Sequence, residues 1–271
     1  MTELIAEIGW NHMGDMDIAE KMIKSASESG AKYAKFQTWS VERLKKGEWD
    51  NDGRREIYEK AELSIKDHQI LIEFCNNYKI NFLSSCFSLE DAYLLKNLNQ
   101  KNIKIPSFEV RNKDLIKYCL DSFQHVFLST GTANEHDINN LKNIVKGYST
   151  TVMHCVSSYP CNSENANLPR ISRLSNIFDD VGFSDHVGGI NASIASLEYN
   201  PSFIEKHFTI DKNLPGRDNK FAILPDELSK LVEYIKQKEL FMIDHGISYQ
   251  SCEEISRRDY QGRFAKAKIE N

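Results

Sequence analysis

The 271-residue sequence lacks the features that mark several large classes of protein. It has no excess of basic residues, with 34 Lys and Arg against 39 Asp and Glu, so a nucleic-acid-binding surface is not expected. No apolar run reaches the roughly 18–20 residues that a membrane span needs. The N-terminal residues do not form a charged leader ahead of an apolar segment. We therefore expect a cytoplasmic protein that binds neither nucleic acid nor membrane.

Cysteine pairs and nucleotide-binding loops are also missing. None of the six cysteines belongs to a C-x-x-C pair, and cytoplasmic thiols are reduced by default. No G-x-G-x-x-G follows the first apolar run, and no G-x-x-x-x-G-K-[ST] occurs. The usual signals of dinucleotide and nucleoside triphosphate binding are therefore absent.

What the sequence does contain is a repeated alternation of short apolar, β-branched runs with helical patterns. Strands alternating with helices form a parallel sheet, and eight repeats predict a closed (β/α)8 or TIM barrel, with an open doubly wound sheet as the alternative. We assign the barrel to residues 1–245 as a single domain, followed by a short tail, 246–271. The predicted strands are 4–8, 32–36, 80–84, 103–105, 126–128, 151–154, 181–184 and 202–208.

Polar residues stand at the end of each predicted strand, where a barrel places its chemistry. Lys35 lies inside a strand that is expected to be buried, and a buried lysine is costly unless anions surround it. One interpretation is that Lys35 and Lys104 face a phosphate or carboxylate ligand. The alternative is a salt bridge from Lys35 to Glu7 or Glu109.

Two histidines, His186 and His207, end neighbouring predicted strands. Either one alone would be interpreted as a core histidine with its hydrogen bonds satisfied. Together they favour a shared divalent metal, because neutral imidazole is a common metal ligand. His154 has a similar position on the sixth strand, and both a structural and a site-supporting role stay open for it.

Several segments, in order along nearly the whole chain, resemble signatures of the sialic acid (N-acetylneuraminate) synthase family. This resemblance implies a (β/α)8 barrel that condenses phosphoenolpyruvate with an acyclic sugar aldehyde, such as that of an N-acyl hexosamine. The product is a 3-deoxy-2-keto sugar acid of the sialic acid (nonulosonic acid) type, and phosphate is released. The segments are AEIGWNHMG (6–14), KFQ (35–37), KIPSFE (104–109), STG (129–131), HCVSSYP (154–160), GFSDH (182–186), IEKHF (204–208) and PGRD (215–218).

The resemblance also implies roles for residues at matching positions. The metal ligands would be His186 and His207, for manganese or alternatively magnesium or cobalt. The catalytic candidates are Glu7, Glu205 and Asp218. Residues implied to bind phosphoenolpyruvate are Lys35, Ser85, Lys104, Ser107, Ser129, Ser157 and Ser184. Residues implied to surround the sugar are Gln37, Glu109, Tyr159 and Asp218. A homodimer is expected as well.

The sequence departs from the family pattern at a few positions, most of them on the sugar side or the pocket wall. Phe108 stands where glycine is usual, Arg217 where proline is common, and Ser157 where close relatives have an amide. Ser85-Cys86-Phe87 replaces a Thr-Pro-Phe pattern. The family usually continues into a small antifreeze-like domain that reaches across a dimer, and we expect the barrel without that domain here.

Without that domain, another segment is expected to cover the mouth of the barrel and exclude water. The insert at 40–64 follows the second strand and so emerges at the catalytic face; the alternative is a solvated surface loop. The tail is the second candidate. The side chains that make these segments candidates are Arg43, Lys45, Lys46, Trp49, Arg54 and Arg55 in the insert and Arg257, Arg258 and Arg263 in the tail.

Two other functions are alternatives to the metal-dependent synthase. One is a Schiff-base aldolase on the same barrel, with Lys104 or Lys206 as the nucleophile. That mechanism has no need of paired histidines. The other is a non-catalytic barrel that binds sugar acids or a partner enzyme.

Overall fold

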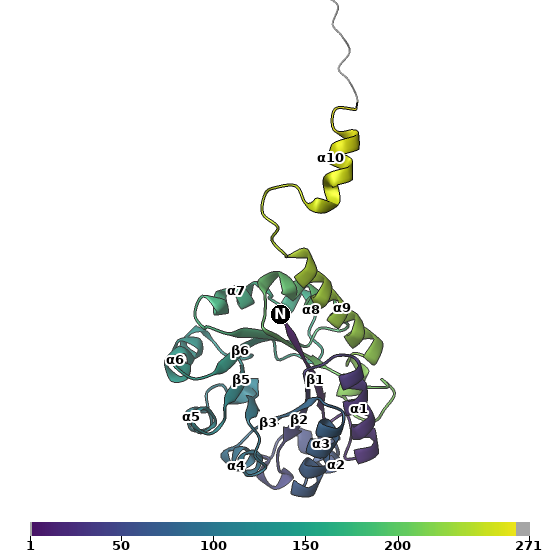
Figure 1. Ribbon diagram of the computed structural model, residues 1–271. Coiled ribbons are helices and arrows are strands. Elements are labelled where there is room, and N and C mark those ends of the chain that lie inside the picture. The colour runs from purple at the N-terminus through teal and green to yellow at the C-terminus, as the bar shows by residue number, and fades with distance from the viewer. Residues whose placement is uncertain (1, 264–271) are drawn as a thin grey trace, which may run out of the picture. The chain divides into compact units, whose positions relative to one another are not determined.

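The computed structural model describes residues 2–263, apart from the side chain of Trp49, and its eight parallel strands close into a barrel in chain order (Figure 1). The predicted TIM barrel is confirmed and the open-sheet alternative is wrong. The strands are β1 (Glu3–Gly9), β2 (Tyr33–Thr38), β3 (Asn81–Cys86), β4 (Asn102–Ile105), β5 (His125–Ser129), β6 (Thr150–Cys155), β7 (Val181–Asp185) and β8 (Phe203–His207). The helices that follow them are α1 (Met16–Glu28), α3 (Ile65–Asn77), α4 (Leu89–Asn97), α5 (Lys113–Ser122), α6 (Glu135–Val145), α7 (Pro169–Ser175), α8 (Asn191–Ser196) and α9 (Pro225–Phe241).

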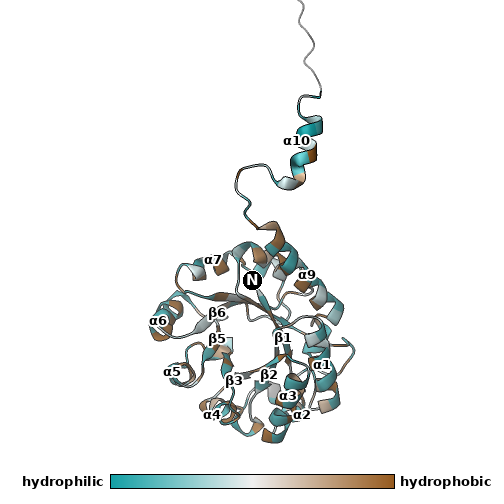
Figure 2. Cartoon of the chain, viewed as in Figure 1, coloured by the Kyte–Doolittle hydropathy of each residue, from teal (hydrophilic) through white to brown (hydrophobic). Residues whose placement is uncertain are grey.

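Short polar side chains cap several of the helices, among them α1 and α4. Asp15 accepts a hydrogen bond from the backbone N–H of Ile18, and Ser88 accepts one from that of Asp91. Each such cap stabilises its helix by about 1 kcal/mol. In Figure 2 the helices around the barrel carry both hydrophilic and hydrophobic residues, as amphipathic helices do.

The insert after β2 contains structure that the sequence does not predict. It holds two short 3-10 turns, η1 (Val41–Arg43) and η2 (Glu48–Asp50), and a helix, α2 (Arg54–Ala61). The end of α2 lies against the loop that follows β1: a Cβ atom on Gly14 would be 2.1 Å from the backbone oxygen of Lys60. Only glycine fits at position 14, which also has a positive φ of 80°.

Two layers of side chains fill the interior of the barrel. The lower layer is apolar: Ile5, Tyr33, Leu83, Phe127 and Met153 form a buried cluster against which Phe203 packs. Since alternate residues of a strand share a face, the residues two positions further along these strands form the next layer. This upper layer is polar and comprises Glu7, Lys35, Ser85, Ser129, Cys155 and Glu205. The apolar layer therefore forms a floor beneath a buried polar site.

The chain divides into two compact units, residues 1–235 and 236–271. The first holds the barrel. The second, described up to residue 263, holds the end of α9, a short turn η7 (Ser251–Glu253) and helix α10 (Glu254–Tyr260). The division falls inside α9, before the boundary at 245/246 that we assigned from sequence. Within the described residues, no helix has both the length and the apolar character needed to cross a membrane.

Candidate active site

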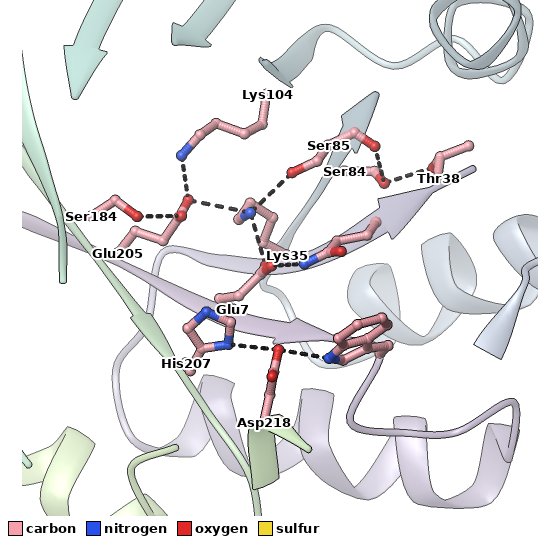
Figure 3. A network of polar contacts seen from close by, with 12 residues as sticks. Glu7, Lys35, Thr38, Ser84, Ser85, Lys104, Ser184, Glu205, His207 and Asp218 are labelled. Atoms are coloured by element: carbon pink, nitrogen blue, oxygen red, sulfur yellow. Dashed lines mark hydrogen bonds and ion pairs between the residues drawn. The ribbon is translucent and has the colours of Figure 1, made fainter. Parts of the chain in front are cut away.

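Four buried charges of alternating sign lie at the carboxyl end of the barrel interior (Figure 3). Lys35 Nζ is 2.9 Å from Glu7 Oε2 and 3.4 Å from Glu205 Oε2, and Lys104 Nζ is 2.7 Å from the same Glu205 oxygen. Lys35 Nζ also donates to Ser85 Oγ at 3.0 Å. The salt bridge from Lys35 to Glu7, held as an alternative from sequence, is thus present. It joins a larger network in which both lysines converge on one carboxylate.

The two carboxylates of this network have opposite pKa shifts. Burial opposes the ionisation of Glu205, but the charges of Lys104 and Lys35 outweigh it and hold the pKa of Glu205 well below its usual range. Burial raises the pKa of Glu7, and repulsion from Glu205 adds to the effect despite the attraction of Lys35. Glu205 is therefore a fixed anion, whereas Glu7 is the carboxylate that takes up a proton more readily.

The lysines differ in the same way. Burial lowers the pKa of Lys104, and the nearby Lys35 contributes to this shift. Burial also disfavours the charge of Lys35, but the attraction of Glu205 and Glu7 outweighs it and raises the pKa of Lys35. The pocket therefore holds one firmly charged ammonium and one that is easier to deprotonate.

Neutral side chains orient the two carboxylates. Gln37 Nε2 donates to Glu7 Oε1 at 2.6 Å, and Ser184 Oγ donates to Glu205 Oε1 at 2.9 Å. Ser184 and Glu205 are paired in the register of β7 and β8. These contacts complete a continuous network of seven residues that the sequence predicts for the site.

A second group of hydroxyls converges on Gly131. A Cβ atom at this position would lie 2.2 Å from Ser157 Oγ and 2.7 Å from Ser107 Oγ, so a side chain would displace both. The Gly131 N–H donates to Ser107 Oγ at 3.0 Å, and Cys155 Sγ lies 3.4 Å from the same hydroxyl. Ser129, also predicted for the site, is buried at the end of β5. Neither Gly131 nor Cys155 was identified as a site residue from sequence.

His186 and His207 lie next to each other, with ring centroids 5.5 Å apart. His186 Nδ1 donates to the backbone oxygen of Val156 at 2.8 Å, so in the neutral imidazole Nε2 keeps its lone pair. Burial disfavours the charged form of His186, but the nearby Cys155 outweighs it and raises the pKa of His186, so a metal at Nε2 would have to displace a proton. Burial, reinforced by His186, holds the pKa of His207 well below its usual range, so His207 is neutral. Its buried Nδ1 has no hydrogen-bond partner within the described part of the chain.

This pair of imidazoles fits a divalent metal that keeps open coordination positions. The described residues contain no group of three or more His, Cys, Asp and Glu side chains that would enclose an ion by themselves. A metal would therefore be held by His186 and His207 and would keep positions for water or substrate oxygens. A bound metal would give the buried Nδ1 of His207 the partner that it lacks among the described residues.

Asp218 links this pair to an aromatic residue from the first loop. Its Oδ2 accepts a hydrogen bond from Trp10 Nε1 at 2.6 Å and lies 3.6 Å from His207 Nδ1. Burial raises the pKa of Asp218 to about 6, although the Trp10 hydrogen bond opposes the shift. Tyr159 lies over His186, with ring centroids 4.3 Å apart. Trp10 was quoted in a motif but not recognised from sequence as a site residue, because its partner lies 208 residues away.

Three residues considered from sequence lie apart from these clusters. Glu109 accepts a hydrogen bond from Asn112 at 2.8 Å, and no contact of its side chain with the other predicted site residues occurs among the described residues. Lys206 is buried and pairs with Asp185 at 3.0 Å, on the opposite side of β8 from its neighbour Glu205. His154 bonds a backbone oxygen at 2.8 Å and is buried, which favours the structural role that sequence left open.

The insert contributes aromatic contacts at the rim of this site. Tyr58 of α2 lies 5.0 Å from Trp10 and 5.6 Å from Trp39, as measured between ring centroids. Lys45 and Lys46 are exposed. The side chain of Trp49 lies outside the described residues. The arginines of the insert all contact carboxylates: Arg43 contacts Asp91, Arg54 contacts Asp52, and Arg55 contacts Asp50 and Glu59.

The arginines of the tail make local contacts within the second unit. Arg257 stacks on Tyr249 at 4.1 Å, and Arg263 lies 5.3 Å from the ring of Tyr260. Arg258 pairs with its neighbour Asp259 at 2.7 Å. The idea that the tail covers the barrel stays a prediction.

Comparisons with known proteins extend these observations. The sequence matches the NeuB family over residues 22–246, a range that includes every predicted site residue except Glu7. It is 36% identical over 270 residues to an N,N'-diacetyllegionaminic acid synthase of Campylobacter jejuni, with 93% of this chain and 80% of that protein covered. It is 30% identical over 254 residues to N-acetylneuraminate-9-phosphate synthase of Mus musculus, covering 87% of this chain and 70% of that protein.

Solved structures give the same relationship. The crystal structure of an N-acetylneuraminic acid synthetase from Leptospira borgpetersenii, in complex with citrate, aligns with a TM-score of 0.84 at 30% identity. The alignment covers 96% of this chain and 92% of that one. The family match spans most of the barrel, and the relatives align over most of their own length. The resemblance seen in the sequence is confirmed: this chain belongs to the NeuB family.

Proposed function

We propose that this chain is a synthase that joins phosphoenolpyruvate to the open-chain aldehyde of an N-acyl hexosamine or a related sugar. The products are a 3-deoxy-2-keto sugar acid and phosphate. The observation that carries the proposal is the position of two buried lysines, Lys35 and Lys104, beside the paired imidazoles of His186 and His207. The relatives named above are synthases of acids of this class. A cytoplasmic homodimer is the proposed form.

The lysines are proposed to bind the phosphate and carboxylate of phosphoenolpyruvate through charge-assisted hydrogen bonds. Glu205 holds both ammonium groups in place before the substrate arrives. A bound anion adds negative charge next to Glu7, so Glu7, whose pKa is already raised, is the group expected to take up a proton in response. The proposed hydroxyl donors are Ser85, Ser107, Ser129, Ser157 and Ser184.

His186 and His207 are proposed to hold a divalent metal, with manganese as the first choice and magnesium or cobalt as alternatives. When bound, such an ion polarises the aldehyde carbonyl. The residues proposed to hold the sugar are Gln37, Glu109, Tyr159 and Asp218. Among these, Asp218 lies nearest to the imidazoles, at 3.6 Å from His207, and can manage protons of the sugar hydroxyls or of the aldehyde oxygen.

The overall reaction consumes one water. C3 of phosphoenolpyruvate attacks the aldehyde carbon, and the aldehyde oxygen gains a proton. Water adds to C2, and phosphate leaves from C2 to give the keto acid. Glu7, oriented by Gln37 at 2.6 Å, is proposed to position this water or to stabilise the cationic C2.

One observation favours a second candidate, the Schiff-base aldolase. Burial lowers the pKa of Lys104, and a lysine with a lowered pKa is the usual nucleophile of that mechanism. Its ammonium is nevertheless 2.7 Å from Glu205, which favours the charged form. Borohydride reduction in the presence of a keto acid would trap the Schiff base as a covalent adduct on Lys104, and we expect no adduct.

Phosphate release tests the proposed function. Purified protein is incubated with phosphoenolpyruvate and a panel of free and phosphorylated hexosamines and hexoses, with manganese or with a chelator. We expect release that needs both a sugar and the metal. If no sugar supports release, the non-catalytic barrel is the better account. Release from phosphoenolpyruvate alone would indicate a hydrolase instead.

A further inference from the structure

Trp10 is the residue that joins the insert to the candidate active site. It directly follows β1 and is half-buried. Its ring meets two aromatic rings from other segments: Trp39, just after β2, at 6.0 Å in an edge-on arrangement, and Tyr58 of α2, at 5.0 Å. Trp39 and Tyr58 also touch each other, with centroids 5.6 Å apart. The three rings therefore form one cluster in which each member contacts both others.

The polar edge of Trp10 makes a separate contact with Asp218. Its Nε1–H donates to Asp218 Oδ2 at 2.6 Å, a short bond in which the acceptor is a largely buried carboxylate. Asp218 begins a short turn (Asp218–Lys220) in the loop after β8, so its orientation depends on contacts outside a regular strand. The same Oδ2 atom is the one nearest to His207 Nδ1. The indole N–H thus fixes which carboxylate oxygen faces the imidazole.

The insert supports this arrangement from its outer side. Tyr58 lies on α2, whose end is held close to the first loop by the contact between Gly14 and the Lys60 backbone oxygen. Two separate contacts, one backbone and one aromatic, therefore dock α2 on the loop that carries Trp10. Loss of the Tyr58 ring would remove one of the two rings that hold the indole in this orientation.

We propose that Trp10 is a positioning residue, which holds Asp218 toward His207 through its indole N–H and is itself held by Tyr58 of the insert. The inference rests on the proposed function, because it assigns Asp218 to the sugar-aldehyde side of that reaction. It gives the insert a defined role: Tyr58 on α2 packs against Trp10, whose indole N–H donates to the Asp218 carboxylate. Trp10 acts through Asp218 and is not a catalytic residue itself.

The hydrogen bond can be observed without an activity assay. The sequence has three tryptophans, so an ¹⁵N–¹H spectrum of the intact protein has three indole signals, and Trp10→Phe identifies the one from Trp10. We expect that signal to lie downfield in wild type and to move upfield in Asp218→Ala and in Tyr58→Ala. Tyr93→Ala removes an exposed aromatic ring elsewhere, on α4, and is expected to leave the signal in place.

Kinetics then test the positioning role. Trp10→Phe keeps an aromatic ring and removes the N–H, and we expect kcat to fall about tenfold or more while the KM for phosphoenolpyruvate stays within about twofold. Tyr58→Ala should reproduce part of this loss, and Tyr58→Phe, which restores the ring, should recover most of it. In an Asp218→Ala background, Trp10→Phe should cause little further loss, because either change removes the same hydrogen bond.

The results that would contradict this inference differ from those that would contradict the proposed function. If the Trp10 signal is the same in Asp218→Ala as in wild type, the hydrogen bond does not exist in solution and the inference is wrong. If wild type is active and Trp10→Phe keeps its kcat within twofold, the inference fails while the proposed function stands. If wild type shows no phosphate release with any sugar, the proposed function and this inference are overturned together.

Discussion

Lys104 and Glu205, which are 101 residues apart in the sequence, form an ion pair with an N–O distance of 2.7 Å inside the barrel. Glu205 also lies 3.4 Å from Lys35, so one carboxylate contacts both ammonium groups, and Glu7 supplies the second negative charge. Removing one member of a buried pair leaves the other charge uncompensated. The same arrangement favours the charged form of Lys35 and holds both ammonium groups in place.

This arrangement predicts how lysine substitutions affect the substrates. We expect Lys35→Met and Lys104→Met each to raise the KM for phosphoenolpyruvate tenfold or more and to change the KM for the sugar far less. A hydrogen bond to a charged group contributes roughly 1.5–3 kcal/mol. Lys96→Met, on the outer helix α4, is the matched control. A KM for phosphoenolpyruvate within about twofold of wild type in both site variants would show that these lysines do not bind its anions.

Replacing either of the two histidines is predicted to remove activity and to leave the fold intact. His186→Ala and His207→Ala each remove one of two proposed metal ligands, and several kcal/mol of transition-state stabilisation should be lost with the metal. Turnover with manganese and metal content by elemental analysis are measured together with circular dichroism. His136→Ala, at an exposed position of α6, is the control. Near-normal turnover by the double variant in a chelator would contradict the metal assignment.

The raised pKa of Asp218 predicts that the free energy of unfolding falls as the pH rises. Its pKa is raised from 3.8 to about 6 in the folded protein. The folded state therefore binds more protons than the unfolded chain between these values, and stability falls as the pH rises from about 4 to above 6. In metal-free protein at pH 7.5, Asp218→Asn should raise the free energy of unfolding by up to about 3 kcal/mol, at about 1.4 kcal/mol for each pKa unit.

Urea unfolding at pH 7.5 and pH 4, in a chelator, measures this effect. The gain from Asp218→Asn should shrink at the lower pH, where the native carboxyl is protonated. Asp226→Asn is the control, because Asp226 is exposed and forms a surface pair with Lys230. An Asp218→Asn protein that is less stable than wild type at pH 7.5 would show that the charged carboxylate is stabilised in the fold.

The insert is predicted to act as the lid of the sugar site. Deleting residues 44–56 removes η2 and the first turn of α2, and we expect the KM for the sugar to rise while metal binding is spared. Replacing Lys45 and Lys46 by glutamine keeps the segment and changes only its exposed charge. Unchanged sugar kinetics in the deletion variant would place the lid elsewhere, or show that the site works without one.

The barrel was predictable because its signals are local. Apolar strands alternate with capped amphipathic helices. On the side of several strands that points into the barrel, an apolar residue is followed two positions later by a polar one, as Ile5 is by Glu7 and Tyr33 by Lys35. Helix α2 was not predicted because only Ala61 of its eight residues is buried, so its sequence carries little periodic apolar signal.

Long-range contacts account for most of what was missed in the site. The bond from Trp10 to Asp218 depends on how the loop after β8 returns over the barrel, which no spacing along the sequence shows. The role of Gly131 is visible only because Ser107 and Ser157 approach it from two other loops. Charged and imidazole groups at strand ends could be recognised from the sequence alone, whereas the residues that orient them required the structure.

One measurement tests the central claim directly. Phosphoenolpyruvate labelled with ¹³C at C3 is incubated with the protein, manganese and the sugar that best supports phosphate release, and the product is examined by NMR and mass spectrometry. The account predicts a 3-deoxy-2-keto sugar acid in which the labelled carbon is bonded to the former aldehyde carbon, formed in equal amount to phosphate. Labelled pyruvate, with the sugar unchanged, would contradict it.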